Sequence, residues 1–396
     1  MVISNGNITK AKLPHLLKYM GSKREIIDFI EESIIELDVK SKWLCDLFAG
    51  SSIVAGSLNY KYNIHANDIQ TYSLILAKTY LSDLGSIKLT CLDEIEDKAV
   101  KLVKQLYSKY PELIFSYKNH FDLEDFALIE KEQQKLIDKN FEIGFHLFTK
   151  YYSGTYWSFN QCIWIDSIRA VAEQYNGKPE YYAIMSSLIF AMSYTSQSTG
   201  HYAQYRDPLT DSSMTDILSY REREIWPYFE KKFLELISIP NYNSQEFKVT
   251  SLDYLDCLRI IEENSIVYAD PPYQSVHYSR FYHVLETLVK YDYPKVEYKG
   301  RYREDRHQSP FCKKTTVNKA FENLFEGVFL KKSHLVLSYS DTGMITLDEI
   351  NIIANKIFSK KYTSWVKVKD HVHSKMGRSD IRSQDVKEYT LLFRRK

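Results

Sequence analysis

The segment from Ser41 to Asp68 limits the possible folds most strongly, because it holds two apolar strand patterns on either side of a turn of small residues. Residues 43 to 48 have the pattern of a buried strand, residues 49 to 52 that of a tight turn, residues 53 to 58 that of a short helix and residues 64 to 67 that of a second strand. Two strands joined through a helix usually lie parallel in one sheet. The chain is therefore expected to be an α/β protein built around a parallel sheet.

Strand patterns return only in the last third of the chain. Residues 266 to 269 and 334 to 340 are apolar runs, and residues 364 to 369 and 388 to 393 predict a hairpin with a long polar connection. The segment before them has helical spacing of apolar residues over about 92 to 140 and 171 to 237. We therefore expect a sheet domain formed by residues 1–85 and 246–396, interrupted by a mostly helical insertion over residues 86–245.

Composition excludes several classes of protein. The chain has 396 residues, 44% of them hydrophobic and 26% charged, which is the balance of a soluble globular protein. It has no apolar run of the roughly 18 residues needed to span a bilayer and no secretory signal pattern, so a cytoplasmic protein is expected. Its five cysteines include no C-x-x-C pair, and neither a disulfide framework nor a metal site is expected. The net charge of +1 neither favours nor excludes nucleic acid as a partner.

The tetrapeptide Asp270-Pro271-Pro272-Tyr273 follows directly after a predicted strand. Ligands of open α/β sheets bind beyond the carboxyl ends of the strands, which places this tetrapeptide at the expected crevice. The exocyclic amine of a base is a poor nucleophile, because its lone pair is delocalised into the ring. Asp270 and the carbonyl of Pro271 can accept its two N–H groups, and Tyr273 offers a ring on which an extruded base can stack. The alternative is a plain turn that ends the strand.

Two further features lie on the first strand–turn–helix unit. The turn after Asp46 contains Gly50, so that a ligand can approach the backbone at the start of the following helix. Asp68 ends the next strand, where a carboxylate can bind both hydroxyls of a ribose. Taken alone, the first feature is equally typical of a plain loop, and the second of a turn or helix-capping residue.

In this order the motifs resemble those of the Dam-like (D12 class, alpha group) N6-adenine DNA methyltransferases. Residues 18 to 23 are similar to the family's N-terminal K-W-x-G-x-K motif, and residues 46 to 52 to its D/E-x-F-x-G-x-G motif, with Ser52 in place of the last glycine. Asp270 to Tyr273 matches the catalytic motif without change. The resemblance implies a Rossmann-like sheet that binds S-adenosylmethionine, a helical target-recognition insertion, and N6 of adenine in double-stranded DNA as the methylated atom.

The resemblance also implies a set of site residues. Asp270, Pro271, Pro272 and Tyr273 would be catalytic. Asp68 would bind the ribose of the cofactor, and Asp253 its adenine. The cofactor contacts together would come from Lys18, Tyr19, Gly21, Lys23, Asp46, Phe48, Gly50, Ser52, Asp68, Ile69, Asp253, Tyr254 and Asp270.

Two segments are candidates for DNA contacts. Between residues 295 and 314 seven basic residues outnumber three acidic ones, and we expect phosphate contacts from Arg301, Arg303 and Arg306. A solvated surface loop is the alternative for this segment. By resemblance, residues 198 to 206 correspond to a loop that enters the duplex beside the target base. Its candidate contacts are Gln204, Tyr205 and Arg206.

Two other functions stay open at this point. A cytosine-N4 DNA methyltransferase needs the same geometry, although serine more commonly stands there in the place of Asp270. A catalytically silent DNA-binding module is the alternative from a different class, and the intact Asp270, Tyr273, Asp68 and Gly50 argue against it. A separately encoded restriction endonuclease is a candidate partner.

Overall fold

The computed structural model describes residues 2–4, 7–9, 13–117, 122–198, 200–239, 245–273, 275, 277–374 and 383–396. At its centre lies a seven-stranded sheet with the strand order β10-β11-β9-β6-β3-β4-β5. The strands are β3 (Trp43–Asp46), β4 (Asn63–Asn67), β5 (Phe247–Thr250), β6 (Ile266–Ala269), β9 (His334–Ser340), β10 (Tyr362–Ser374) and β11 (Ser383–Arg395). β11 runs antiparallel to both of its neighbours, whereas all the other pairings in the sheet are parallel.

Helices cover both faces of the sheet, as is usual for parallel strands. The covering helices are α1 (Ile27–Glu36), α2 (Ile53–Leu58) and α3 (Thr71–Leu81) on one face, and α11 (Tyr254–Ile260), α14 (Val317–Leu330) and α15 (Leu347–Phe358) on the other. Strand residues alternate between the two cores: Ile266 and Tyr268 of β6 belong to the first cluster, and Val267 and Ala269 to the second. This double cover explains why the strands are almost continuously apolar.

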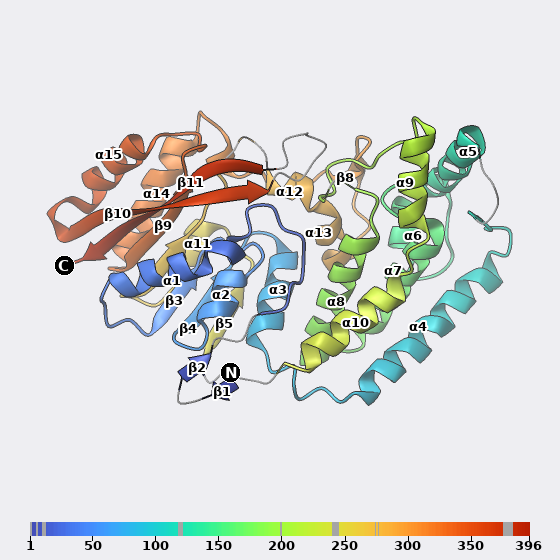
Figure 1. The fold of residues 1–396 in the computed structure, drawn as a ribbon, viewed down its shortest axis with the longest axis horizontal. Helices are drawn as coiled ribbons and strands as arrows, with labels where there is room; N and C mark the ends of the chain where they lie inside the picture. The colour runs from blue at the N-terminus through green and yellow to red at the C-terminus, as the bar shows by residue number, and fades with distance from the viewer. Residues whose placement is uncertain are drawn as a thin grey trace.

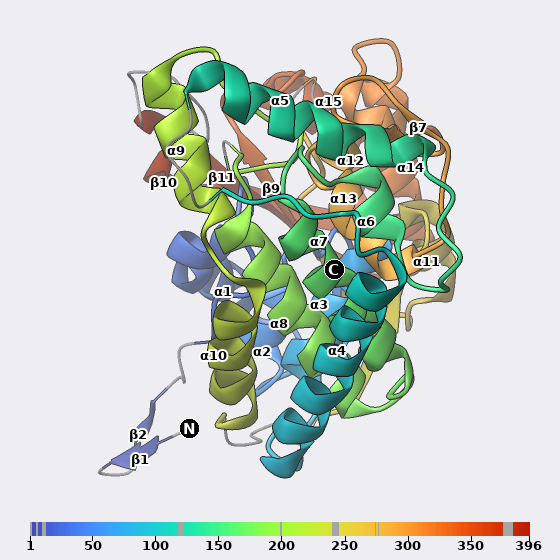
Figure 2. The same cartoon turned by 90° about the vertical axis from the view of Figure 1, so that its right-hand side faces the viewer.

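A group of helices lies beside the sheet, on the right of Figure 1 and toward the viewer in Figure 2. It consists of α4 (Thr90–Lys109), α5 (Leu123–Gln134), α6 (Leu147–Tyr151), α7 (Phe159–Glu173), α8 (Pro179–Thr195), α9 (Asp211–Arg221) and α10 (Ile225–Ile237). One apolar cluster continues from the sheet face through α3 into α8 and α10. Thr79 of α3 also bonds Ser186 of α8, with their hydroxyl oxygens 2.6 Å apart. The helical segment thus shares its core with the sheet.

The remaining elements are short. They are β1 (Val2–Ser4), β2 (Asn7–Thr9), α12 (Tyr278–Phe281), α13 (His283–Lys290), β7 (Val296–Glu297), β8 (Tyr302–Arg303) and the 3-10 turns η1 (Lys23–Ile26), η2 (Lys135–Asp138), η3 (Pro310–Cys312) and η4 (Ser359–Lys361). Of the helices within the described ranges, none has the length and apolar character needed to cross a bilayer.

The expected fold class is confirmed. The first strand–turn–helix–strand unit forms as β3, α2 and β4, with β3 and β4 parallel. The expected C-terminal hairpin also forms, and its strands are longer than predicted, since the pairing extends outward to Tyr362 opposite Arg395. Most of its polar connection, residues 375–382, lies outside the described residues.

Candidate active site

A pocket with about 1010 Å³ of empty space opens at the carboxyl ends of β3, β4 and β6. Most of the residues predicted from the motifs line it, although they come from four distant parts of the chain. They are Tyr19, Gly21, Lys23, Phe48, Gly50, Asp68, Ile69, Asp253, Tyr254, Asp270, Pro271, Pro272 and Tyr273. The parallel strands bring them together, because successive strands end at the same edge of the sheet.

The turn after β3 is held in an unusual backbone conformation. Gly50 has a φ of +50°, and a Cβ atom there would lie 2.9 Å from the hydroxyl oxygen of Tyr19. Ser52 has a φ of 59° and a ψ of 21°, which is the left-handed region that favours glycine. Its hydroxyl donates to the carbonyl of Ser73 at 3.3 Å, and the Ser73 hydroxyl donates to the carbonyl of Gly50 at 2.7 Å. The turn therefore keeps its shape although Ser52 replaces the family's glycine.

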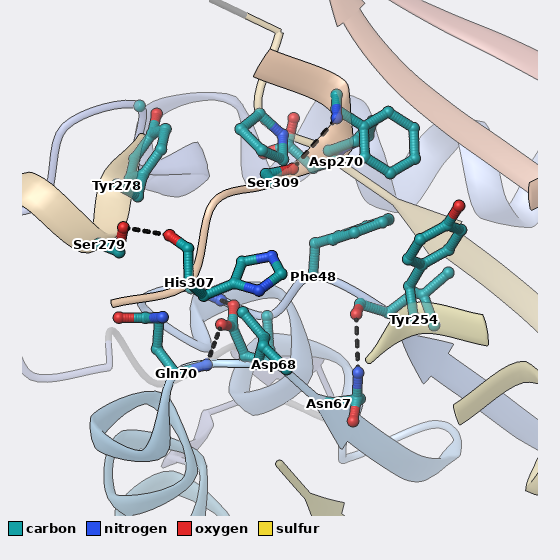
Figure 3. Close-up of a pocket in the computed structure, with 18 of the residues that line it drawn as sticks. Phe48, Asn67, Asp68, Gln70, Tyr254, Asp270, Tyr278, Ser279, His307 and Ser309 are labelled. Carbon is teal, nitrogen blue, oxygen red and sulfur yellow. Dashed lines mark hydrogen bonds between the residues drawn. The ribbon is translucent and has the colours of Figure 1, made fainter. Parts of the chain in front are cut away.

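Asp68 stands at the end of β4 and faces this turn (Figure 3). Its carboxylate accepts the backbone N–H of Gly50 at 2.9 Å and that of Gln70 at 2.8 Å. Burial raises the pKa of Asp68 to about 6, against the lowering effect of these two hydrogen bonds. The carboxylate is thus fixed in direction at the pocket wall.

Asn67, one residue earlier, joins three strand ends. Its amide nitrogen donates to the carbonyls of Leu47 at 3.2 Å and Leu252 at 3.1 Å. Its amide oxygen accepts the N–H of Leu252 at 3.1 Å and the hydroxyl of Thr250 at 2.8 Å. These four bonds set the width of the pocket floor between β3, β4 and the loop after β5.

Three aromatic rings form an apolar slot on one side of the pocket. Phe48 lies 5.8 Å from Tyr254 in a stacked arrangement and 5.5 Å from Phe311 edge-on, measured between ring centroids. The side chain of Asp253 accepts the N–H of Leu255 at 2.9 Å and so caps α11. Figure 3 shows Phe48 and Tyr254 at the side of the pocket opposite Gln70. The slot suits a flat, apolar ring.

The N-terminal segment reaches the pocket through stacked tyrosines. The rings of Tyr19, Tyr278 and Tyr282 form a triangular cluster, in which the Tyr19 centroid lies 5.6 Å from that of Tyr278 and 4.8 Å from that of Tyr282. The backbone N–H of Met20 donates to the hydroxyl oxygen of Tyr282 at 2.8 Å. Gly21 has a φ of +71°, and a Cβ there would lie 2.8 Å from the Tyr278 hydroxyl. This close approach explains why a glycine stands at position 21.

Lys23 places a buried positive charge next to the catalytic motif. Its Nζ lies 3.2 Å from Oδ1 of Asp270 and 3.3 Å from Oε2 of Glu388. Burial acts to lower the pKa of Lys23, but the charges of Asp270 and Glu388 outweigh it and raise this pKa above its ordinary value. Lys23 is therefore a cation held by two carboxylates.

The ring of Tyr273, the aromatic residue of the tetrapeptide, lies beside the ammonium of Lys23. The Tyr273 ring centroid is 5.7 Å from Nζ of Lys23 and 5.7 Å from the ring of Tyr339. The carbonyl of Tyr273 accepts the N–H of Met344 at 3.0 Å. The ring is held from two sides while still lining the pocket.

Three of the residues expected to touch a cofactor are not among those that line the pocket. Lys18 lies with its Nζ 4.2 Å from the ring centroid of Tyr194 in α8. Asp46 is buried under the turn, where its carboxylate accepts the N–H of Ala55 at 3.1 Å, and burial raises its pKa to about 8. Ser52 is also buried behind the turn. Asp46 and Ser52 shape the pocket from beneath, without facing it.

Arg301 and Arg303, which were expected to contact phosphates, have side chains that are buried and bonded within the protein. Arg301 donates to the carbonyls of Tyr151 and Gln134. Arg303, 2% exposed, forms a bidentate ion pair with Asp292 at 2.6 and 2.8 Å and bonds Asp305 at 3.0 Å. A net count of charge along the sequence could not separate such internal pairs from free cations.

Arg306 differs from these two arginines. It is partly exposed, and among the described residues no carboxylate pairs with it. Its guanidinium lies 5.7 Å from the ring centroid of Tyr302, and it lines a second hollow that shares Ile69, Gln70, Ser279 and His307 with the main pocket. Arg306 therefore remains a candidate for contact with a ligand outside the pocket.

The loop from Ser198 to Arg206 is only partly available to a ligand. Gln204 is exposed and Tyr205 is half-buried against Tyr156, at 5.8 Å between ring centroids. Arg206 is held by an ion pair with Asp216 and by Gln197, whose side-chain oxygen accepts its Nε–H at 3.3 Å. Among these three predicted contacts, Gln204 is the most accessible.

Several residues that line the pocket were not predicted as site residues. They are Leu47, Ala49, Ser51, Ile53, Asn67, Gln70, Leu252, His277, Tyr278, Ser279, His307, Ser309, Pro310 and Phe311. The last four lie at the end of the basic segment, where the expected chemistry was phosphate binding. Ser279 donates its hydroxyl to the carbonyl of His307 at 2.5 Å, which fixes this loop over the pocket. Because the segment is rich in basic residues, its sequence pointed to phosphate binding and gave no sign that its end forms a wall of the pocket.

Cys45, His65 and Cys257 come together beneath the pocket, although sequence spacing gave no sign of it. Their ligand atoms all lie within 4.8 Å of one another, and all three residues are buried. Nε2 of His65 is hydrogen-bonded to the hydroxyl of Thr250 at 3.0 Å. A closed zinc site takes four ligands, one more than this cluster supplies from the described residues. The three residues belong to β3, β4 and α11, so the cluster links these elements.

Comparison with known proteins adds independent information. Residues 19–342 match the sequence profile of the D12 class N6 adenine-specific DNA methyltransferases. The chain is 24% identical to the modification methylase LlaI of Lactococcus lactis subsp. lactis over 86% of this chain and 49% of that protein. It is 25% identical to the type II methyltransferase M.FokI of Planomicrobium okeanokoites over 85% of this chain and 46% of that protein. The chain thus spans about half the length of these two relatives.

A third relative is matched nearly end to end. The type II methyltransferase M.NlaIII of Neisseria lactamica is 24% identical over 85% of this chain and 87% of its own length. The family profile covers the pocket motifs from Tyr19 through Asp270 to the end of β9. The chain belongs to the D12 class of N6 adenine-specific DNA methyltransferases.

Proposed function

We propose that this protein transfers a methyl group from S-adenosylmethionine to N6 of adenine in a specific sequence of double-stranded DNA. The observation that carries the proposal is that Asp270 to Tyr273 lines the same pocket as Gly50, Asp68 and the aromatic slot. A group that activates an amine and a site shaped for a nucleoside thus share one cavity. Family membership adds adenine as the expected target.

The chemistry of the pocket walls suits S-adenosylmethionine. The slot of Phe48, Tyr254 and Phe311 suits the adenine ring of this cofactor, and Asp68 suits its ribose hydroxyls. The cofactor, when bound, supplies an electrophilic methyl group on a sulfonium. Gly50 and Gly21 let the backbone pack closely against Tyr19 and Tyr278, two tyrosines that line the same pocket.

The roles of the catalytic motif follow from its position beside Lys23. Asp270 accepts one N–H of the target amine, and the carbonyl of Pro271 accepts the other, which directs the lone pair of the nitrogen toward the methyl group. Tyr273 stacks on the base, which leaves the duplex because a reacting base must be taken out of the stack to be reached. Lys23, whose Nζ lies 3.2 Å from Oδ1 of Asp270, holds this carboxylate in place by an ion pair.

The helical segment over residues 86–245 is proposed to recognise the DNA sequence. It lies beside the sheet (Figure 1). The candidate DNA contacts are Gln204, which is exposed, and Arg306, which is partly exposed. The relatives named modification and type II methyltransferases suggest a restriction-modification system with a separate endonuclease as partner.

The test is nucleoside analysis of DNA after incubation with the protein and S-adenosylmethionine labelled in its methyl group. We expect label only in N6-methyladenine. Label in N4-methylcytosine would show the alternative reaction on the same geometry, because that pocket would activate another exocyclic amine. Label in no nucleoside, on DNA of varied sequence, would favour a DNA-binding module without activity.

A further inference from the structure

We propose that Glu388, on the antiparallel strand β11, is a positioning residue for methyl transfer, which it serves by sharing the ammonium of Lys23 with Asp270. The inference rests on the proposed function and adds to it a residue from the C-terminal strand. Glu388 lies 115 positions after Tyr273, the last residue of the tetrapeptide.

The geometry brings three charged groups from three elements into one cluster. Lys23 begins η1, Asp270 follows β6, and Glu388 lies in β11 opposite Ser340 of β9. Nζ of Lys23 is 3.3 Å from Oε2 and 3.4 Å from Oε1 of Glu388, so both oxygens of this carboxylate face the ammonium. The distance from Nζ to Oδ1 of Asp270 is 3.2 Å.

The two carboxylates differ in their access to the pocket. The side chain of Glu388 is 1% exposed, whereas that of Asp270 is 19% exposed and lines the pocket. The single ammonium of Lys23 is thus shared by two carboxylates. The more buried carboxylate is the one that needs the cation most, because desolvation penalises its charge more strongly.

The sharing of Lys23 between two carboxylates explains how Asp270 remains a strong hydrogen-bond acceptor. A carboxylate that alone held a buried ammonium would direct its negative charge into that ion pair. Because Glu388 holds Lys23 from the other side, Lys23 can orient Asp270 without binding it fully. Asp270 then presents a negative oxygen to the amine, and Glu388 acts through Lys23 without touching the substrate.

The test compares Glu388→Gln with wild type in single-turnover transfer of labelled methyl to DNA of mixed sequence. We expect the rate to fall on the order of tenfold to a hundredfold, the usual effect of removing a partner that orients a reacting group. The affinity for S-adenosylmethionine should stay within about threefold, because Glu388 does not line the pocket. Glu388→Asp keeps the charge and should retain more activity than Glu388→Gln. An unchanged rate in Glu388→Gln would overturn the proposal.

A double-mutant cycle separates this role from a purely structural one. If Glu388 acts only through Lys23, then Lys23→Met/Glu388→Gln should be as active as Lys23→Met alone, to within about twofold. Rate losses that multiply in the double variant would overturn the proposal. The same comparison holds if Glu388→Gln alone fails to fold, since the double variant removes a buried cation together with its buried partner.

Glu130→Gln is the matched control, because Glu130 is also a buried carboxylate paired with a buried cation, Arg221. It should lower the melting temperature and leave the transfer rate of the folded protein unchanged. Wild-type protein that labels no nucleoside would refute the proposed function itself. Active wild type with an equally active Glu388→Gln would refute only the role of Glu388.

Discussion

The two parts of the molecule bury positive charge in different ways. In the helical segment, Arg221 of α9 pairs with Glu130 of α5, with side chains 0% and 4% exposed. The pair is bidentate, at 3.0 and 2.5 Å, and Arg221 also donates to the carbonyl of Thr155 at 2.8 Å. One positive and one negative charge balance each other, and neither residue lines the main pocket.

The charge cluster of the sheet, formed by Lys23, Asp270 and Glu388, differs because it borders the pocket. Lys23 has two carboxylate partners, and one of them, Asp270, lies in the pocket wall. The Arg221–Glu130 pair can only stabilise one packing arrangement, whereas the Lys23 cluster has a carboxylate, Asp270, that a ligand in the pocket can reach. The comparison predicts that changes in the two clusters affect different properties, namely stability in one and catalysis in the other.

The largest effect is expected for Asp270→Ala. The variant lacks the carboxylate that accepts an N–H of the target amine, so the rate of methyl transfer should fall by about 10³-fold or more. A loss of this size is usual for a group that acts mainly in the transition state. Affinity for the cofactor should stay within a few fold, because the aromatic slot and Asp68 remain. Transfer rates and cofactor binding by calorimetry would check both parts. Equal loss of binding and rate would contradict the division between catalysis and cofactor binding.

Glu130→Gln should have the next largest effect, and on stability alone. Breaking a buried ion pair from one side leaves Arg221 without its counter-charge and destabilises by about 3–5 kcal/mol. Denaturant unfolding measures the free energy, and the transfer rate per folded molecule serves as the second readout. A slower folded enzyme would mean that the helical pair is coupled to the pocket.

The ionisation of Asp68 should make the affinity for the cofactor depend on pH, an effect of intermediate size. Only the ionised carboxylate accepts the ribose hydroxyls, so cofactor affinity should fall as the pH drops through about 6, the pKa to which burial raises this group. Asp68→Ala should weaken binding by about 1–3 kcal/mol at neutral pH. Because burial raises the pKa of Asp68 in the folded protein above its ordinary value of 3.8, the contribution of this group to stability is fully present below pH 3.8 and is lost as the pH rises through about 6. Binding that is independent of pH from 5 to 8 would contradict this role.

The sheet and its motifs were predictable because local pattern determines them. The strand, turn and helix from Trp43 to Leu58 each occupy consecutive residues, and Asp270 follows its strand directly. Parallel pairing then brings the strand ends together without further information. The pocket therefore follows from motifs on separate strands plus one topological rule.

Contacts between distant segments were not predictable in this way. Arg303 looked like a free cation because its partner Asp292 belongs to a different turn, and their pairing depends on the path of the loop. Cys45 and Cys257 are more than two hundred positions apart, and only the packing of α11 on β3 brings them together. Glu388 joins the active site because β11 inserts between β9 and β10.

Arg306 and Arg303 extend the comparison to DNA binding. If Arg306 meets a phosphate, Arg306→Gln should weaken binding to all sequences alike and reduce the slope of log affinity against log salt by about 0.9. Arg303→Gln should leave that slope unchanged and reduce stability, because its guanidinium is bonded to Asp292 and Asp305. Salt titrations of DNA binding with both variants would check this. A lower slope in Arg303→Gln would restore Arg303 as a phosphate contact.

The smallest effect is expected for Ser52→Gly, at the turn where this chain departs from the family motif. Ser52 has a φ of 59°, and a residue with a Cβ is strained in this region by about 1–2 kcal/mol relative to glycine. The substitution removes that strain, but it also removes the hydroxyl bond to Ser73, whose length of 3.3 Å indicates a weak interaction. Glycine further gains entropy in the unfolded chain, which offsets part of the relief. We therefore expect a stability change between zero and about 1 kcal/mol in favour of glycine, with cofactor affinity unchanged because Ser52 does not line the pocket. Thermal unfolding with and without S-adenosylmethionine measures both quantities, and a clear loss of stability would show that the bond to Ser73 outweighs the backbone strain.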